Sequence, residues 1–380
     1  MVLSAIVLLL IIFSVTPALL FSIPAVQNAT IDKAALFASE YLGTRVEVGK
    51  ITIGMFNRVV VRDFYVEDLD GDTLLYVKRA DVTIGPLASL ANKNLVLRVG
   101  EVRGGKFVLR ETERKTYNVK EITDQLTKKD RKSEFRLDIA DLKGSDIDFR
   151  LHRRAPLRDV GIDYANMHLL GIDVELKNFA VIGGIVESEV ESLSFTERTG
   201  FRLDNMTGRF SVNFGKIAVD GAVLTTSRSR INLDHLLLDG ESWLDYKDFI
   251  NVVPIRCKVS HCDISSEDVG YFAPAMWRWN TSLHNVTASM DGTVADFKGV
   301  LSRAELERGG LLRGSAQVRG LVNVERTHFD IKVDELRATT DEIAGLLHNI
   351  AGLSVKGAAQ DYVSRVAAVD ASGKIGRAHV

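Results

Sequence analysis

The sequence predicts a mainly β protein that follows an apolar N-terminal segment, and three observations support this class. Many short segments alternate apolar and polar residues, which is the period of a strand with one buried face. The chain of 380 residues contains 30 glycines but only 6 prolines, a balance that favours many turns between strands. Residues 2–21 contain no charged side chain and are almost entirely apolar.

The N-terminal apolar run is long enough for one membrane crossing, which needs roughly 20 residues. It extends from Val2 to Phe21, and the first charged residue of the chain is Asp32. A cleaved signal peptide is the alternative, but its apolar core would be shorter and a small-x-small cleavage site would follow. We therefore expect residues 1–22 to form an uncleaved transmembrane signal-anchor, with the remaining chain exported across the membrane.

Residues 23–44 are expected to form a short amphipathic helix. Asn28 or Thr30 would cap its first turn, and Gly43 would end it. Its apolar face could lie on the membrane surface or cover the end of a sheet, and it consists of Ile31, Ala35, Ala38 and Leu42. The polar side lacks the Lys and Arg density of a membrane-surface helix, so we favour the second arrangement.

Residues 45–372 are expected to form the β-rich part of the chain. The segment FRLDIADLKGSDIDFRL, residues 135–151, places apolar residues on one face and charged residues on the other. We interpret it as two strands of a hairpin whose turn contains Gly144. Residues 94–110 give a second such pair, and similar alternation recurs along the chain without a strict sequence repeat.

Two short helices are expected to interrupt the strands. The segment NVKEITDQL begins with Asn118, and Glu121 follows three residues later in an arrangement similar to a capping box. The segment TTDEIAGLLHNI contains Thr339 and Glu342 in the same relation, and residues 343–350 provide one apolar helical face.

The segment DLDGD is the clearest candidate for a metal site. Asp68, Asp70 and Asp72 have the spacing of the first ligands of a calcium loop. However, Thr73 stands where such a loop needs glycine, and Arg79 stands where it needs a bidentate glutamate. Because a turn between two strands accounts for the same residues, we expect a turn and no metal.

Cys257 and Cys262 are the only cysteines, and His261 lies between them in the segment RCKVSHC. Two cysteines are too few for a disulfide framework, and a zinc site would need a fourth ligand and closer spacing. In a regular strand, residues five apart face opposite sides of the sheet. We therefore expect a structural role for both residues, with a disulfide between them as the alternative.

Composition and motifs argue against several classes of function. A net charge of -2 and an aromatic content of 7% provide neither the basic surface nor the stacking side chains of a nucleic-acid-binding protein. The sequence lacks a nucleophile elbow, a phosphate-binding loop and a zinc-protease motif, so we expect no enzymatic activity and no cofactor. A secreted carbohydrate-active protein would need exposed aromatic platforms, whereas we interpret the cluster MWRWN around Trp277 as turn packing.

A family resemblance covers residues 2–151. Its most characteristic stretches, after the apolar run and the helix ending in Leu42-Gly43, are LGTRVEVGKITIG, VVVRDFYVEDLDGDTLLYVKRADVTIGPLASL and LVLRVGEVRGGKFVLR. Together they resemble the amino-terminal part of the TamB/AsmA-like envelope proteins, and residues 68–82 are most similar to versions from Bacteroidetes-type bacteria. Beyond residue 151 the resemblance is limited to alternating strands broken by short helices.

The resemblance implies a fold, a location and a role. Members are single-pass inner-membrane proteins whose periplasmic part is an elongated, curved, antiparallel-rich β-sheet, folded into a taco-like trough with an apolar lining. The implied role is to conduct phospholipids between the inner and outer membranes, as a member of the bridge-like lipid transfer class. The alternative is a structural or assembly factor for the insertion of outer-membrane β-barrel proteins and for protein secretion, with a TamA-like partner in the outer membrane.

Two features of the resemblance concern the extent of the chain. Members are much longer, so we expect this chain to be an amino-terminal fragment of the translocation and assembly module type. The last seven residues, KIGRAHV, read like the translation of a sequencing adapter. We therefore interpret residues 373–380, which are this stretch and the glycine before it, as a sequencing artefact.

The apolar faces of the alternating strands are the candidate site. In a trough they would line a lane for lipid chains, whereas in a sandwich they would pack against a second sheet. Alternation alone does not separate these two possibilities, and the resemblance favours the trough. The expected lining consists of Leu95, Leu97, Val99, Phe107, Leu109, Phe135, Leu137, Ile139, Ile147, Phe149, Ile172, Val174 and Leu176.

Overall fold

The computed structural model divides into two compact units, unit 1 with residues 1–213 and unit 2 with residues 214–380. Both units are mainly β with few helices, which confirms the predicted class. The structure describes residues 35–36, 39–40, 42–55, 57–85, 94–120, 122, 136–182, 185–242, 245–278, 280–320, 328–339 and 369–378.

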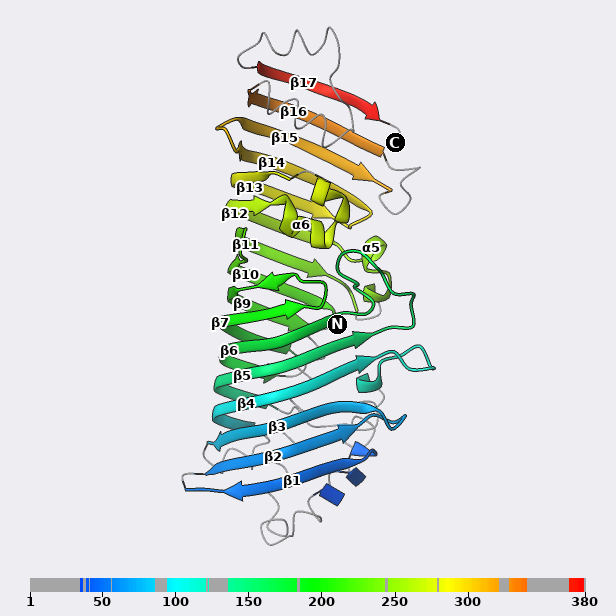
Figure 1. Ribbon diagram of the computed structural model, residues 1–380, viewed down its shortest axis with the longest axis vertical. Coiled ribbons are helices and arrows are strands. Elements are labelled where there is room, and N and C mark those ends of the chain that lie inside the picture. The colour runs from blue at the N-terminus through cyan, green and yellow to red at the C-terminus, as the bar shows by residue number, and fades with distance from the viewer. Residues whose placement is uncertain are drawn as a thin grey trace. The chain divides into compact units, whose positions relative to one another are not determined.

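Unit 1 contains an open, curved sheet in which strands that follow one another in the chain are neighbours (Figure 1). All of these pairs are antiparallel except β4 with β5, which run parallel. A parallel pair needs a crossover connection, and residues 111–135 provide it. The strands are β1 (Val46–Ile53), β2 (Arg58–Glu67), β3 (Thr73–Ile84), β4 (Asn94–Arg110), β5 (Arg136–His152), β6 (His168–Ile182), β7 (Ile185–Glu197), β8 (Arg202–Leu203) and β9 (Asn205–Asn213).

The predicted hairpin at residues 135–151 is wrong, because the structure forms one continuous strand there, β5. The pair predicted at residues 94–110 is likewise a single strand, β4. The residues Gly144-Ser145-Asp146 do not reverse the chain. Asp146 has a left-handed backbone with φ of 55°, which is typical of a β-bulge that bends a strand without ending it.

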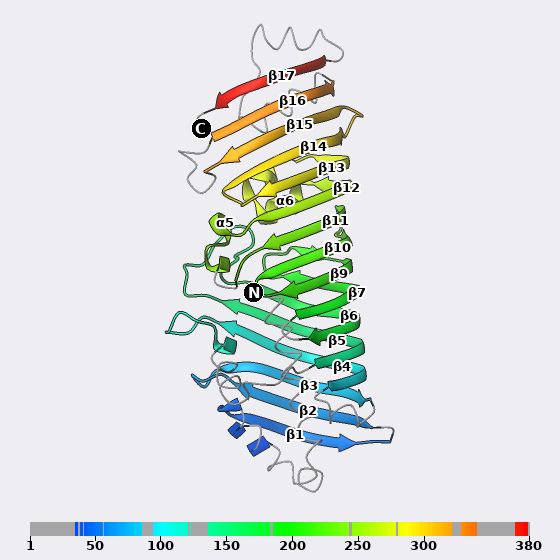
Figure 2. The ribbon, with the colours of Figure 1, turned by 180° about the vertical axis from the view of Figure 1, so that it is seen from behind.

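A row of such bends crosses unit 1 from β1 to β5. At each bend, two consecutive residues lie off the apolar face, and we call this pair a two-residue step. The apolar positions on either side stay in register between strands, as when Val61 pairs with Ala80 and Phe64 pairs with Val77. Figure 2 shows how sharply β4 to β6 bend. The steps of this row are Gly49-Lys50, Arg62-Asp63, Lys78-Arg79, Arg103-Gly104 and Ser145-Asp146.

The segment before β1 is helical and ends as the sequence predicts. Residues 35–36, 39–40 and 42 are helical, and Gly43 has φ of 70°. The Gly43 N–H donates to the Ser39 carbonyl at 2.8 Å, which is the usual C-terminal arrangement for a left-handed glycine. Leu42 is buried, whereas Leu36 is exposed.

The strands of unit 2 also form open sheet, and each of them pairs antiparallel with the next. Its strands are β10 (Lys216–Thr225), β11 (Arg230–Asp239), β12 (Ile255–Ser265), β13 (Ser282–Gly292), β14 (Asp296–Leu306), β15 (Leu311–Arg319), β16 (His328–Ala338) and β17 (Val369–Ala378). Its helical turns are η2 (Asp245–Asp248), α5 (Phe249–Val252), α6 (Ser266–Phe272) and η3 (Pro274–Arg278).

The turn-packing interpretation of MWRWN agrees with the contacts of α6 and η3. Ser265 caps α6 by accepting a hydrogen bond from the Glu267 N–H. The Trp277 indole donates to the Glu267 carbonyl at 2.9 Å, and its ring meets that of Tyr271 edge to face at 5.5 Å. The tryptophan therefore holds the two short helices together.

Expected features that lie outside the described residues include the apolar anchor at residues 1–22, the capping residues Asn28 and Thr30, and the helix predicted at residues 340–350. In the part of the chain that the structure describes, no helix is both long and apolar enough to cross a membrane. Residues 373–378, which we interpret as artefact, lie in β17.

Candidate functional site: the apolar sheet faces

The apolar side chains of unit 1 form rows that run across its strands on one face of the sheet. One row places Phe107 of β4 beside Phe149 of β5, with ring centroids 5.7 Å apart. The strand register extends this row on both sides, so that it contains Val46, Val66, Leu75, Phe107, Phe149 and Leu169. Such cross-strand pairs are the units that stabilise a sheet.

Most of the residues predicted to line a groove lie on this face and are enclosed by protein. Ile147 and Val174 are half-buried. Phe135 and the side chain of Leu95 lie outside what the structure describes. The buried members are Leu97, Phe107, Leu109, Leu137, Ile139, Phe149, Ile172 and Leu176.

Val99 departs from the pattern, because it is 41% exposed and lies off the apolar face. A second row of two-residue steps crosses β4 to β6 and accounts for its position. Arg98-Val99 is the step in β4, where Gly100 takes the next place on the apolar face beside Leu142. The other steps of this row are Ala140-Asp141 and Lys177-Asn178.

The steps also explain which apolar-face residues the sequence analysis missed. Leu142 and Phe179 are buried on the same face as Ile139, although simple alternation from Ile139 does not reach Leu142. The signal was present in the sequence as two consecutive non-core residues inside an alternating run. Counting such pairs as bends, and not as turns, would have kept both residues in the row.

The opposite face of unit 1 is charged, as the alternation predicts. The Arg136 guanidinium contacts the Asp138 carboxylate at 2.6 Å, and Lys143 contacts Glu175 at 2.9 Å. These pairs are exposed, and pairs of this kind contribute little to stability. They keep this face of the sheet in water while the other face is covered.

The apolar face of unit 1 is closed. Among the described residues, the largest fully buried side chains all fall within residues 42–197 and include Phe107, Phe149 and Phe179. Segments outside the strands add buried apolar side chains of their own, namely Leu42, Ile122 and Ile162. Unit 1 therefore uses its apolar face as a core.

The apolar face of unit 2 is only half covered. Its rows follow the register of β10 to β16, as when Leu236 pairs with Cys257 and Leu301 pairs with Gly314. Leu236, Met290, Leu301 and Val333 are half-buried, and Ile331 is 36% exposed. A small closed cluster is centred on Cys262, Val286 and Ala304.

Both cysteines lie on this apolar face of unit 2, so the expectation that they face opposite sides is wrong. Ser260-His261 forms a two-residue step between them, and His261 has φ of 51°. Because of this step, Cys262 lies on the same face of the sheet as Cys257, although their positions are five residues apart. Both thiols are free, and burial raises the pKa of each.

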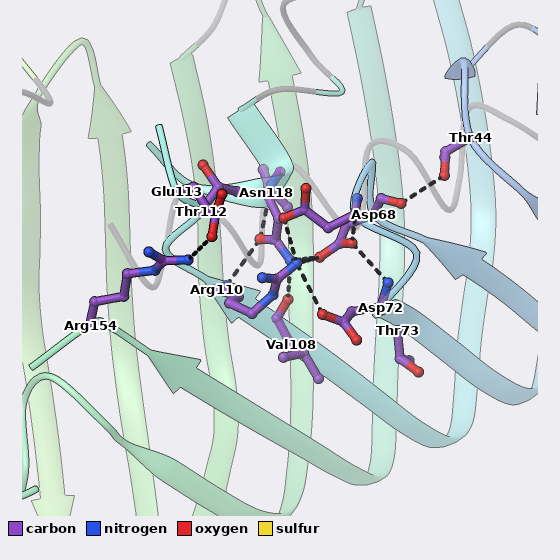
Figure 3. A network of polar contacts seen from close by, with 12 residues as sticks. Thr44, Asp68, Asp72, Thr73, Val108, Arg110, Thr112, Glu113, Asn118 and Arg154 are labelled. Atoms are coloured by element: carbon purple, nitrogen blue, oxygen red, sulfur yellow. Dashed lines mark hydrogen bonds and ion pairs between the residues drawn. The ribbon is translucent and has the colours of Figure 1, made fainter. Parts of the chain in front are cut away.

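A polar network closes one end of β2 to β4 (Figure 3). Asp68 is buried, and its carboxylate accepts hydrogen bonds from the backbone N–H groups of Asp70 and Asp72, both at 3.0 Å. The Asn118 amide donates to the same carboxylate at 3.1 Å. Burial works to raise the pKa of Asp68, but hydrogen bonds from Arg110, Asn118 and the Asp72 backbone hold that pKa below its ordinary value.

The three aspartates with calcium-like spacing converge on an arginine. Nη2 of Arg110 lies 2.8, 2.9 and 3.1 Å from the carboxylates of Asp68, Asp70 and Asp72. Within the described residues, no group of three or more acidic, histidine or cysteine side chains is arranged to hold a metal ion. The segment is a turn whose carboxylates are bound by the Arg110 guanidinium.

Comparison with known proteins finds no family model that matches the chain and no curated protein that matches it. The apolar faces, their burial and their charged reverse sides are therefore the observations that bear on function.

Proposed function

We propose that the chain is a membrane-anchored periplasmic protein that conducts phospholipids along the apolar face of a β-sheet trough, between the inner and outer membranes. The observation that carries the proposal is the half-covered apolar face of unit 2. It continues across seven strands, β10 to β16, and six spacings of about 4.8 Å give it a length of about 29 Å. The resemblance to the TamB/AsmA-like proteins supports the same role.

The physical chemistry of this face suits a lipid chain. Each buried CH₂ group is worth about 0.8 kcal/mol, so exposing a whole lipid tail to water costs roughly ten kcal/mol or more. Side chains such as Leu236, Leu301 and Ile331 can cover a tail without fixing it, because apolar contacts are non-directional. A continuous apolar lane would lower the barrier to movement while the headgroup stays in water.

Photo-crosslinking at two neighbouring positions of β14 tests the proposal. Leu301 lies on the apolar face and Val300 lies on the opposite face, where it is 37% exposed. A photo-reactive residue at each position, in the full chain in its membrane, would be irradiated and the adducts identified by mass spectrometry. We expect phospholipid adducts at position 301 and none at position 300.

Other outcomes would contradict the lane. Adducts at position 301 only to other segments of this chain would mean that the face is closed in the working protein. Adducts to foreign polypeptides without lipid would favour the assembly role with an outer-membrane barrel partner. Equal lipid labelling at positions 300 and 301 would indicate general contact with membrane.

A further inference from the structure

The connection between β5 and β6 has an exposed surface that is separate from the apolar faces of the sheet. Residues 154–160, with the sequence RAPLRDV, are all exposed. Leu157 is 62% exposed, Val160 is 53% exposed, and Tyr164 further along is 48% exposed. Single exposed apolar side chains are ordinary, but here three of them lie within eight residues of one connection.

The base of this loop holds it in one shape. Ile162 and Asp163 are buried beneath the exposed tip. The Asp163 carboxylate accepts hydrogen bonds from the backbone N–H groups of Arg158 at 3.0 Å, Ala165 at 3.0 Å and Asn166 at 3.1 Å. These bonds form an Asx-type turn, so the exposed apolar side chains belong to an ordered loop.

The charges of the loop are unevenly divided between base and tip. The Asp163 carboxylate is used inside the loop and lies 3.6 Å from the Arg198 guanidinium. The tip, residues 154–160, contains two basic residues, Arg154 and Arg158, and one acidic residue, Asp159, so it has an excess of positive charge. Arg154 reaches Glu113 at 3.2 Å, but both groups are exposed, and a pair of this kind is easily exchanged for another partner.

We propose that residues 154–164 bind the surface of an anionic phospholipid bilayer. Leu157, Val160 and Tyr164 enter the interface, and Arg154 and Arg158 face the lipid phosphates. A stable protein partner would need about 800 Å² and roughly 20 to 30 residues on this side. A bilayer needs only a few apolar side chains beside basic ones, because binding grows with buried apolar area and with attraction to anionic lipid.

This contact is separate from the lipid lane of the proposed function. It requires only that the loop reaches a membrane surface, and no lipid has to leave the bilayer. The two proposals can therefore fail independently, because the crosslinks at Leu301 report on the lane and the experiment below reports on the loop.

Vesicle binding by the full chain tests the loop. The chain would be held in a nanodisc of phosphatidylcholine, which gives its apolar N-terminal segment a bilayer. Flotation with phosphatidylcholine vesicles, with and without phosphatidylglycerol, then measures contact with a second membrane. We expect binding only with phosphatidylglycerol, weakening as salt is added.

Two loop variants should lose this binding. Leu157→Ser with Val160→Ser removes the apolar contact, and we expect at least a tenfold loss. Arg154→Ser with Arg158→Ser should lose about fivefold for each arginine. All four side chains are exposed, so the strand content measured by circular dichroism should not change.

Matched controls remove the same kinds of group elsewhere. Phe214→Ser removes an apolar side chain that is 65% exposed, and Arg256→Ser with Arg313→Ser removes two exposed arginines from strands. These variants should bind as the wild type does. The proposal is overturned if the loop variants bind like wild type, if neutral vesicles bind equally well, or if a photo-crosslinker at Leu157 labels only polypeptide.

Discussion

Phe149 in β5 and Leu301 in β14 both point to the apolar face of their sheet, but only Phe149 is enclosed by protein. In unit 1 the row through Phe107 and Phe149 belongs to a core, and neither of these side chains is more than 2% exposed. In unit 2 the rows through Leu236 and Leu301 are half covered. The same alternating pattern therefore produces a core in one region and an open face in the other.

Strand length is one source of this difference. β4 and β5 have 17 residues each and carry two rows of steps, whereas β10 to β16 have 9 to 11 residues. At about 3.3 Å per residue, 17 residues span about 56 Å and 11 span about 36 Å. Because packed sheet faces lie about 10 Å apart, the longer strands leave more chain on both sides of a bend to fold over the apolar face, and Leu42 and Ile122 from outside the strands add to its cover.

Truncation of a side chain on the apolar face should give the largest difference in lost stability between the two units. Phe149→Ala should destabilise unit 1 by about 3–5 kcal/mol, because it leaves a cavity among enclosed neighbours. Leu301→Ala should cost unit 2 only about 1 kcal/mol, because its side chain is already partly in water. Hydrogen exchange read by mass spectrometry separates the two units, and equal losses would contradict the difference in closure.

The Asp68 network should give the next largest effect. Asp68→Asn should cost unit 1 about 2 kcal/mol at neutral pH, because a buried charge-assisted contact with Arg110 is lost. Asp291→Asn, at an exposed position of β13, should cost nearly nothing. Urea unfolding followed by hydrogen exchange would measure both.

The same network makes unit 1 sensitive to acid. The folded pKa of Asp68 lies below the unfolded value of about 3.9, so its contribution is complete above that pH. It is lost as the pH falls through the lower, folded pKa. The wild-type chain should therefore lose stability in this range more steeply than Asp68→Asn, and parallel pH profiles would argue against the assignment.

The class of the fold was predictable from sequence because alternation is local. The bends were not, because Gly144-Ser145-Asp146 contains residues that serve equally well in a turn and in a bulge. Which of the two forms depends on the neighbouring strands, and Gly144 pairs with Val102 and Val174. The parallel pairing of β4 with β5 is a long-range choice of the same kind.

For the candidate lining, the sequence predicted which residues share one face of the sheet, but not whether protein covers that face. Alternation placed Leu137 and Phe149 together on one side of the sheet, where the structure has them. Whether protein covers Leu137 and Phe149 depends on side chains from elsewhere in the chain, such as Leu42 and Ile122. No local pattern in β5 carries that information, so the sequence could not separate a core from a lane.

Two glycines sharpen the comparison at a smaller scale. A Cβ atom at Gly144 of unit 1 would lie 2.7 Å from Ile147 Cδ1 and 2.9 Å from Val174 Cγ1. A Cβ atom at Gly299 of unit 2 would meet nothing nearer than 3.8 Å. Gly144→Ala should therefore cost about 1–3 kcal/mol through overpacking, whereas Gly299→Ala should be neutral or slightly stabilising.

Thermal unfolding of the two alanine variants, resolved by unit, would measure this difference. The expected order depends on the closed packing around Ile147 and on the open space at Gly299. If Gly144→Ala were tolerated as well as Gly299→Ala, the apolar face of unit 1 would have room to spare, and its description as a closed core would be wrong.

The smallest effect concerns the steps that bend the strands. Asp146 has φ of 55°, and its N–H donates to the Asp173 carboxylate at 3.0 Å. Asp146→Gly should change stability by no more than about 0.5 kcal/mol, because relief of the left-handed backbone offsets the entropy that glycine adds to the unfolded chain. Asp146→Val should cost about 1–2 kcal/mol, because a β-branched residue is strained there.

Asp148 is the matched control, since it lies two residues further along β5 and its backbone is not left-handed. There the order should reverse, with valine tolerated better than glycine, because regular strands favour β-branched residues. Urea unfolding of the four variants would test this inversion. If valine were preferred at both positions, the left-handed step at Asp146 would not be what bends β5, and the account of closure by long, twice-bent strands would lose its basis.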